Sequence, residues 1–116
     1  MNLFIVSGAP NTGKSTTVYH LCTYLLNLGY VKTDIPYNGK RYSTSTSFPP
    51  ILANDFSCLL EKEGKKVLIH TATDDVFNID ALVNSINNHK PSIVITTCRD
   101  FGDWPRDYFC SQLKLV

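Results

Sequence analysis

The chain has 116 residues, of which 43% are hydrophobic and 18% charged, and its formal net charge at pH 7 is +1. This length predicts one small domain, and the balanced charge argues against a basic nucleic-acid-binding protein or an acidic tail. The apolar runs are too short to span a bilayer, and we expect no signal peptide. The four cysteines are too widely spaced for a zinc site, so we expect reduced thiols in or near the core and a cytoplasmic protein without a membrane partner.

The first segment predicts a strand, a glycine-rich loop and a helix. Leu3–Val6 is a continuous apolar run, as in a strand buried on both faces of a parallel sheet. Residues 8–15 read Gly-Ala-Pro-Asn-Thr-Gly-Lys-Ser. Beyond them, apolar residues recur at helical spacing as far as Gly29, which is a stop signal.

This loop matches the phosphate-binding pattern of glycine, any four residues, glycine, lysine, and serine or threonine. Gly8 and Gly13 let the backbone approach a polyphosphate, and the loop amides converge on the anion at the positive end of the helix. Lys14 would contact the β- and γ-phosphates, and Ser15 would be a ligand of Mg²⁺. The alternative is a glycine turn that carries a lysine by chance. We predict nucleotide contacts from Gly8, Ala9, Pro10, Asn11, Thr12, Gly13, Lys14, Ser15 and Thr16.

Residues 30–48 differ in character from the segments around them. Tyr30–Thr33 and Lys40–Thr44 are strand-like, and Asn38-Gly39 between them is a strong hairpin turn signal. We therefore predict a hairpin with a flexible insert at 30–48. It is either a substrate-facing flap or a plain surface hairpin.

The next segment predicts a second helix and a second strand. Pro49-Pro50 opens the helix, whose apolar face would hold Leu52, Phe56, Leu59 and Leu60, and Gly64 would end it. A buried strand follows at Val67–Thr71, and we expect His70 inside it to be a hydrogen-bonded core histidine rather than a base.

The remaining chain predicts a third helix, a third strand and a last helix. The third helix starts at Asn78 or Asp80, and its apolar face consists of Ile79, Leu82, Val83 and Ile86. The strand is Ser92–Thr97, and the last helix starts near Pro105.

Three apolar strands that alternate with helices predict a three-layer α/β fold over residues 1–116, with a small, mostly parallel sheet. Through Gly8–Ser15 the chain resembles the P-loop nucleoside triphosphatase superfamily. That resemblance implies a P-loop NTPase-like fold, a nucleoside triphosphate with Mg²⁺, and phosphoryl transfer or hydrolysis. A narrow sheet also leaves an edge that a second copy of the chain could cover, so we consider a homo-oligomer.

Ligands of open parallel sheets sit beyond the carboxyl ends of the strands. This rule brings the loop at 8–15 together with two clusters at the ends of the second and third strands, His70–Asp75 and Thr96–Asp100. Asp74 is the candidate carboxylate for the coordination shell of Mg²⁺, and Asp75 is the second choice. In the superfamily this carboxylate usually follows the apolar run directly, whereas here three residues lie between the run and Asp74. The alternative is that both carboxylates cap a turn or the third helix.

Arg99 could reach a phosphate or stack on a base, or it could form a salt bridge with Asp100 or Asp103. We predict that Lys14, Asp74 and Arg99 are catalytic residues of an ATP- and Mg²⁺-dependent phosphotransferase of the nucleotide or small-metabolite kinase type. ATP is favoured because no Asn/Thr-Lys-x-Asp string is present to read guanine.

Two other functions remain open. A slow ATPase could act as a nucleotide-dependent switch for a protein partner, and a binding module could hold nucleotide without turnover. The supply of arginines is small for a kinase: Arg41, Arg99 and Arg106. The sequence does not identify the phosphoryl acceptor or the partner.

Overall fold

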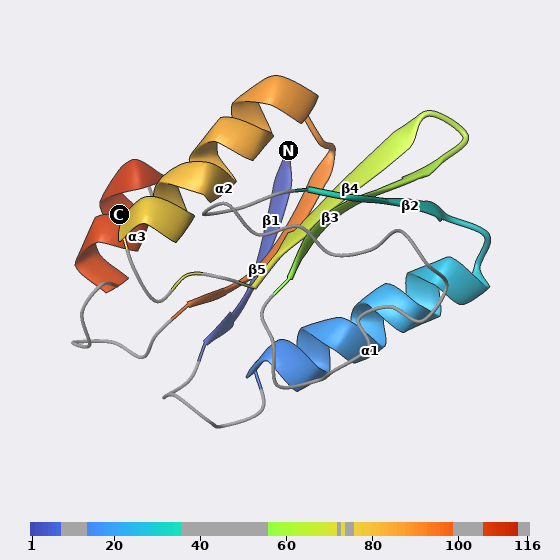
Figure 1. Ribbon diagram of the computed structural model, residues 1–116, viewed down its shortest axis with the longest axis horizontal. Helices are drawn as coiled ribbons and strands as arrows, with labels where there is room; N and C mark the ends of the chain where they lie inside the picture. The colour runs from blue at the N-terminus through green and yellow to red at the C-terminus, as the bar shows by residue number, and fades with distance from the viewer. Residues whose placement is uncertain (8–13, 36–55, 72, 74–75, 99–105, 114–116) are drawn as a thin grey trace.

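The computed structural model describes residues 1–7, 14–35, 56–71, 73, 76–98 and 106–113, without the side chains of residues 14–16. The described strands are β1 (Asn2–Ser7), β2 (Val31–Asp34), β3 (Ser57–Lys62), β4 (Lys65–His70) and β5 (Ile93–Cys98). The described helices are α1 (Lys14–Asn27), α2 (Val76–His89) and α3 (Arg106–Gln112). The five strands form one sheet, with α1 on one face and α2 and α3 on the other (Figure 1).

Each face of the sheet carries its own apolar core. The core under α1 contains Val18, Cys22, Phe56, Cys58, Leu60, Val67, Ile69 and Ile95. The core under α2 and α3 contains Ile35, Leu59, Leu68, Ile79, Leu82, Val94, Cys98 and Phe109. The three-layer α/β arrangement that the sequence predicts is therefore present in the described part of the chain.

The strand order is β1-β5-β4-β3-β2. Strands β1, β5 and β4 are parallel neighbours, whereas β3 is antiparallel to both β4 and β2. The prediction of a mostly parallel sheet is therefore wrong, because two of the four described pairs are antiparallel. The reason is local: a two-residue turn joins β3 to β4, and so short a connection can only reverse the chain.

The second predicted helix is also wrong in its described part, because Ser57–Lys62 is the strand β3. Phe56, Leu59 and Leu60 have a spacing that suits a helix face. In the strand, Leu60 packs toward α1 and Leu59 packs toward α2. A strand that is buried on both faces shows no alternation of polar and apolar residues, so its pattern cannot be told from that of a buried helix. Residues 49–55 lie outside the described part of the chain.

Gly64 belongs to a hairpin turn rather than to a helix end. Glu63 has φ of 52° and Gly64 has φ of 80°. Two consecutive residues with positive φ are what a tight two-residue β-hairpin loop requires. Lys62 and Lys65 face each other on either side of this turn, and it is the turn that adds β3 to the sheet.

Residues 30–48 contribute the edge strand β2, which pairs with β3. The turn predicted at Asn38-Gly39 and the strand predicted at Lys40–Thr44 lie outside the described residues. The hairpin and flexible insert at 30–48 therefore stay a prediction, apart from the strand at its start.

The other predicted elements are confirmed with small shifts in their bounds, but the expected burial of β1 on both faces is wrong, because β1 is an edge strand and Phe4 is 56% exposed. Helix α1 ends before Gly29, whose φ is 98°, and the amide of Tyr30 donates to the carbonyl of Leu25, as in a Schellman cap. Helix α2 begins at Val76 rather than at Asn78 or Asp80, and its Ile79 and Leu82 are fully buried as expected. None of the described helices has the length and apolar character needed to cross a bilayer.

Candidate functional site

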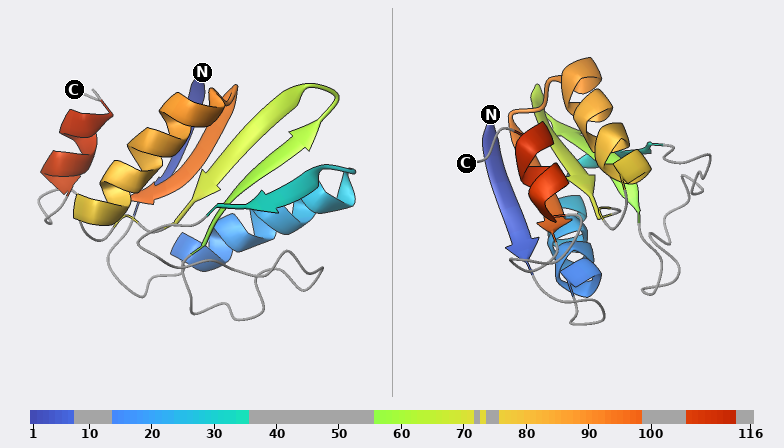
Figure 2. Two further views of the ribbon diagram at one scale, coloured as in Figure 1. Left: turned by 45° about the horizontal axis from the view of Figure 1, so that its top comes forward. Right: turned by 90° about the vertical axis from the view of Figure 1, so that its left-hand side faces the viewer.

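The candidate site lies at the edge of the sheet where β1, β5 and β4 end. Ser7 at the end of β1 is paired with Cys98 at the end of β5, and His70 at the end of β4 is paired with Thr96. Because these strands are parallel neighbours, their carboxyl ends share one edge, as the sequence predicts. Figure 2 shows β1, β5 and β4 running toward this same edge.

The predicted phosphate-binding loop leaves this edge. Strand β1 ends at Ser7 and α1 begins at Lys14, so residues 8–13 connect the two and lie outside the described part of the chain. Lys14, Ser15 and Thr16 form the first turn of α1. The amino end of a helix carries a partial positive charge and unpaired amides, so this end of α1 is electrostatically suited to an anion.

Buried hydroxyl groups tie the ends of β4 and β5 together. The Oγ1 of Thr97 donates to the carbonyl oxygen of Thr71 at 2.9 Å, so the Thr73 hydroxyl, 3.0 Å away, donates to Thr97. The Thr96 hydroxyl donates to the carbonyl oxygen of His70 at 2.6 Å. These side chains are buried, with at most 3% of each threonine exposed. The bonds hold the backbone in place next to the residues predicted to act on a nucleotide.

His70 is a core histidine, as the sequence predicts. It is fully buried, and its Nε2 lies 3.0 Å from the carbonyl oxygen of Asn78. A carbonyl only accepts, so Nε2 carries the hydrogen, and Nδ1 accepts from the Ser57 hydroxyl at 2.9 Å. His70 thereby joins β3, β4 and α2, and both its ring nitrogens are engaged in the interior.

Sequence reasoning did not place Arg106, the first residue of α3, at this edge of the sheet. Its Nη1 donates to the Oγ of Ser7 at 3.3 Å and lies 3.8 Å from the Sγ of Cys98. This guanidinium therefore stands at the ends of β1 and β5, where the predicted loop begins. A signal was available: a helix that follows the last parallel strand must start at the edge where that strand ends.

Asp74, Asp75 and Arg99 lie outside the described residues, and their roles stay predictions. Asp75 directly precedes the first residue of α2, which is where a carboxylate caps a helix, so the capping alternative remains open for it. Asp74 follows Thr73, which is held by its bond to Thr97. Within the described part of the chain no group of three or more His, Cys, Asp or Glu side chains could hold a metal.

The arrangement of strands is compatible with a shared magnesium shell. Strand β5 separates β1 from β4, so the ends of the outer two strands are about 10 Å apart, which is two strand spacings. Mg²⁺ prefers oxygen ligands and keeps several of its waters. A hydroxyl such as that of Ser15 and a carboxylate such as that of Asp74 are oxygen ligands of the kind that the ion prefers, and both side chains lie outside the described part of the chain.

Cys58 is not suited to nucleophilic catalysis. All four are free, and Cys22, Cys58 and Cys98 are buried, as predicted for reduced thiols. A hydrogen bond with Cys22, together with burial, raises the pKa of the Cys58 thiol well above its usual range. The protonated thiol is a poor nucleophile.

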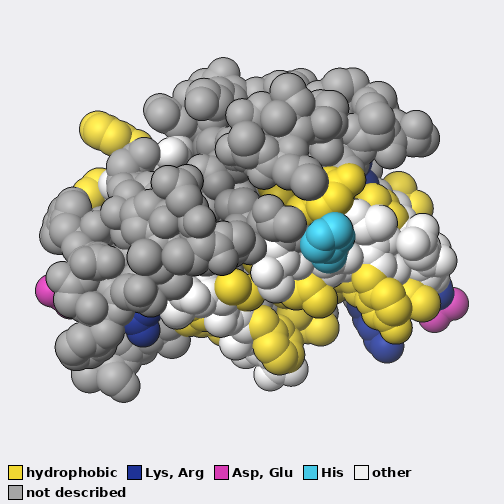
Figure 3. All heavy atoms as spheres, turned by 90° about the horizontal axis from the view of Figure 1, so that it is seen from below, with side chains coloured by type: hydrophobic (Ala, Val, Ile, Leu, Met, Phe, Trp, Pro, Cys, Tyr) yellow, Lys and Arg dark blue, Asp and Glu magenta, His cyan; other side chains and the backbone are white. Residues whose placement is uncertain are grey.

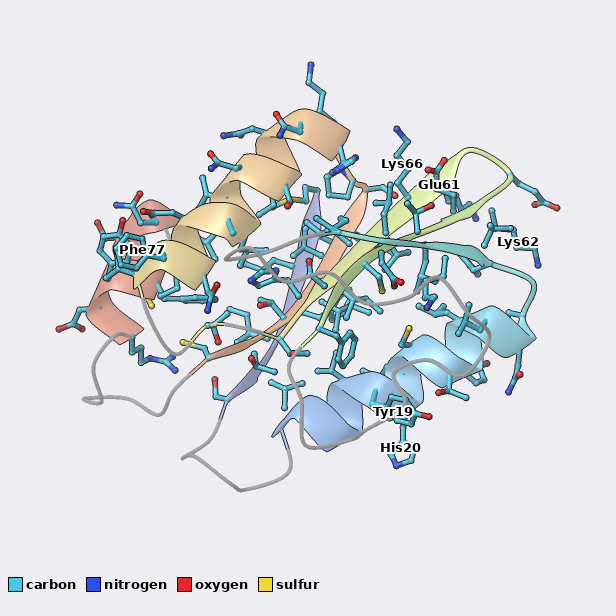
Figure 4. The ribbon with its side chains drawn as sticks, in the orientation of Figure 1. Tyr19, His20, Glu61, Lys62, Lys66 and Phe77 are labelled. Atoms are coloured by element: carbon cyan, nitrogen blue, oxygen red, sulfur yellow. The ribbon has the colours of Figure 1, made fainter. Side chains whose placement is uncertain are left out.

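The charged side chains Glu61, Lys62 and Lys66 gather at the opposite end of the sheet, near the β3–β4 turn (Figure 4). They are therefore remote from the site, and this end of the molecule provides control positions for mutagenesis. Comparison with protein-family models, with curated proteins and with solved structures finds no match.

Proposed function

We propose that this protein is a P-loop nucleoside triphosphatase-like enzyme that uses ATP and Mg²⁺, and that it is a phosphotransferase of the nucleotide or small-metabolite kinase type. One observation carries the proposal. The Gly8–Ser15 motif spans the connection from the end of β1 to the start of α1, at the edge where the parallel strands end. A phosphate-binding loop needs this strand–loop–helix context, and a chance glycine turn would not. The four free cysteines favour a reducing compartment such as the cytoplasm.

In this proposal the loop amides and Lys14 would hold the β- and γ-phosphates. Ser15 would be a ligand of Mg²⁺, and Asp74 would orient the other ligands around the ion. Bound Mg²⁺ would supply charge neutralisation at the phosphate oxygens. The hydroxyl bonds of Thr73 and Thr97 support this arrangement, because they fix the backbone just before Asp74. Preorganised groups stabilise a developing charge without having to reorient.

Arg106 joins Arg99 as a candidate for stabilising charge on the transferred phosphoryl group. The contact of its guanidinium with Ser7 supports this role, because Ser7 directly precedes the loop. Arg106→Ala should then lower kcat more than it weakens ATP binding. Arg106→Lys keeps the charge but loses the planar fork, so partial recovery is expected. Equal losses in kcat and ATP affinity would leave Arg106 with a binding role only.

Thermal unfolding with and without Mg·ATP tests the proposal. At a concentration about 100-fold above Kd, a ligand that binds only the folded state stabilises it by about 2.7 kcal/mol. Lys14→Ala should abolish most of the resulting rise in Tm and leave the fold intact. Lys65→Ala is the matched control, since Lys65 is exposed at the amino end of β4, away from the site. If Lys14→Ala and the parent show the same ATP-dependent rise, the assignment of the loop is wrong.

A second assay separates the kinase from a nucleotide-dependent switch. ADP release is measured with Mg·ATP alone and with a panel of metabolites as phosphoryl acceptors. Stimulation by one acceptor supports the kinase. Slow release that no acceptor changes supports an ATPase switch, and ATP binding without ADP release supports a module that only binds.

A further inference from the structure

Strand β1 forms one edge of the sheet, and the described residues place no strand on its outer side. The amide of Asn2 donates to the carbonyl oxygen of Ser92, next to β5. Because peptide groups alternate in direction along a strand, the N–H and C=O groups of Leu3 and Ile5 point away from β5. An edge of this kind is a template for pairing with another strand.

The two edges of the sheet differ in how they are protected. Strand β2 carries Lys32 and Asp34, which form an ion pair at 3.2 Å with little exposure of either side chain. A strand that paired with β2 would have to accommodate inward-pointing charges, a known device against edge pairing. Strand β1 reads Asn-Leu-Phe-Ile-Val-Ser, with no charge and no proline. Among the described residues, β1 is therefore the edge without such protection.

Strand β1 also presents an exposed aromatic side chain, Phe4, with 56% of its surface accessible. Phe4 is paired with Ile95, a member of the core under α1, so its ring stands on the α1 face at the rim of the sheet. Its neighbours Leu3 and Ile5 pack into the core on the other face. Phe4 can therefore pack against an adjacent strand on the α1 face, because neither core depends on its side chain.

We propose that β1 of a second copy of this chain pairs antiparallel with this edge and joins the two sheets into one. A two-fold axis perpendicular to the sheet relates antiparallel copies of one strand, and the same axis places both Phe4 side chains on the same face. The strand is uncharged and the chain has a net charge of only +1, so two copies meet without strong repulsion. The pairing satisfies the outward backbone groups of both copies.

The exposed side of α1 is the rival surface. It presents Leu21, Tyr24 and Leu28, which are 41%, 61% and 45% exposed, and the described side chains of α1 include no Lys, Arg, Asp or Glu. Hydrophobic side chains gather around a histidine on this lower face in Figure 3, and Figure 4 places His20 there on α1. A helix face carries no unpaired backbone groups that a second copy could satisfy, whereas the edge of β1 offers such groups to a strand.

Sedimentation velocity of the full chain over a range of concentrations tests the pairing, with Phe4→Lys as the disrupting variant. A standard interface buries about 1,200–2,000 Å² and a single strand pair buries less, so we expect a reversible dimer rather than an obligate one. Phe4→Lys should weaken it at least about tenfold, because a lysine on an edge strand opposes pairing. Val31→Lys is the matched control, since Val31 is an exposed apolar residue (69%) on the opposite edge strand.

Hydrogen exchange of the unmodified protein gives a readout that does not depend on how the variants fold. The amides of Leu3 and Ile5 should become protected as the concentration rises, in step with the dimer. A single-chain mass at every concentration would overturn the proposal. So would a dimer that Val31→Lys weakens as much as Phe4→Lys does, or one in which Leu3 and Ile5 gain no protection; Tyr24→Lys would then test α1.

Discussion

Thr97→Val tests whether the buried hydroxyl bonds at the site edge stabilise the fold. Valine keeps the shape of threonine and replaces the hydroxyl with a methyl group, so the change removes two hydrogen bonds and little else. Those are the bonds to the carbonyl oxygen of Thr71 at 2.9 Å and to the hydroxyl of Thr73 at 3.0 Å. Thr73 is only 1% exposed, so water cannot readily replace its lost acceptor.

The expected cost follows from these contacts. Each lost bond is worth about 1 kcal/mol net, and a buried polar group left without a partner costs about 1–3 kcal/mol. The added methyl group offsets about 0.8 kcal/mol when buried. We therefore expect the free energy of unfolding to fall by about 2 kcal/mol, which corresponds to a decrease in Tm of about 8 °C for a chain of this length.

Urea unfolding monitored by circular dichroism measures the change, and Thr23→Val is the matched control. Thr23 is half-buried on α1, and its hydroxyl only donates back to the carbonyl oxygen of Tyr19 at 3.1 Å, a bond that contributes little to a helix. The double variant Thr73→Val/Thr97→Val should cost less than the sum of the single variants, because the two residues share a bond. If Thr97→Val costs no more than Thr23→Val, the hydroxyl bonds do not stabilise this edge.

Of three further predictions, two concern the site and the third concerns the pH dependence of stability. Asp74→Asn should reduce Mg·ATP turnover far more than metal-free nucleotide binding; an equal loss in both assays would leave a structural role and make Asp75 the next residue to test. Arg99→Ala should lower turnover at least roughly tenfold, about 1.4 kcal/mol of barrier, with a much smaller change in ATP affinity; stable protein with unchanged turnover would remove Arg99 from the site. The hydrogen bond that Tyr108 donates to Asp80 raises the pKa of Tyr108 above its ordinary value, because ionisation would break the bond beside a carboxylate. Since the folded-state pKa is the higher one, this stabilisation is present below about pH 10 and is lost as the pH rises through the folded-state value; Tyr108→Phe should therefore lose less stability than the parent between pH 9 and pH 11 in urea unfolding, and equal losses would contradict the assignment.

Local sequence was sufficient for the elements whose pattern is distinctive. The apolar run before Gly8, the helical spacing after Lys14 and the stop at Gly29 correspond to β1, α1 and the cap that ends it. In α2, Ile79 and Leu82 recur on one face because only that face meets the sheet. The helix predictions succeed because such patterns report directly which side of a helix is buried. The apolar run of β1 predicts a strand, but it does not predict that the strand lies at the edge of the sheet.

Strand β3 shows where such patterns are insufficient. Leu59 packs on one face of the sheet and Leu60 on the other, so the segment has no exposed side to reveal its period. The turn at Glu63 and Gly64 decides between helix and strand, since it reverses the chain and pairs Lys62 with Lys65. Glu63 in a left-handed conformation is not a standard turn signal, so the sequence favoured a helix that ended at Gly64.

The sequence by itself determined the glycine–lysine–serine pattern of Gly8–Ser15 and its place between a strand and a helix, on which the proposal of nucleotide binding rests. Only the tertiary structure decided that β1 is an edge strand, that β3 runs against β4, and that Arg106 meets Ser7, a residue 99 positions earlier. The physical reason is that hydrogen bonding along a strand and apolar burial on its faces are local properties. The choice of neighbouring strand instead depends on which connections are short enough to reverse the chain and which need a crossover helix.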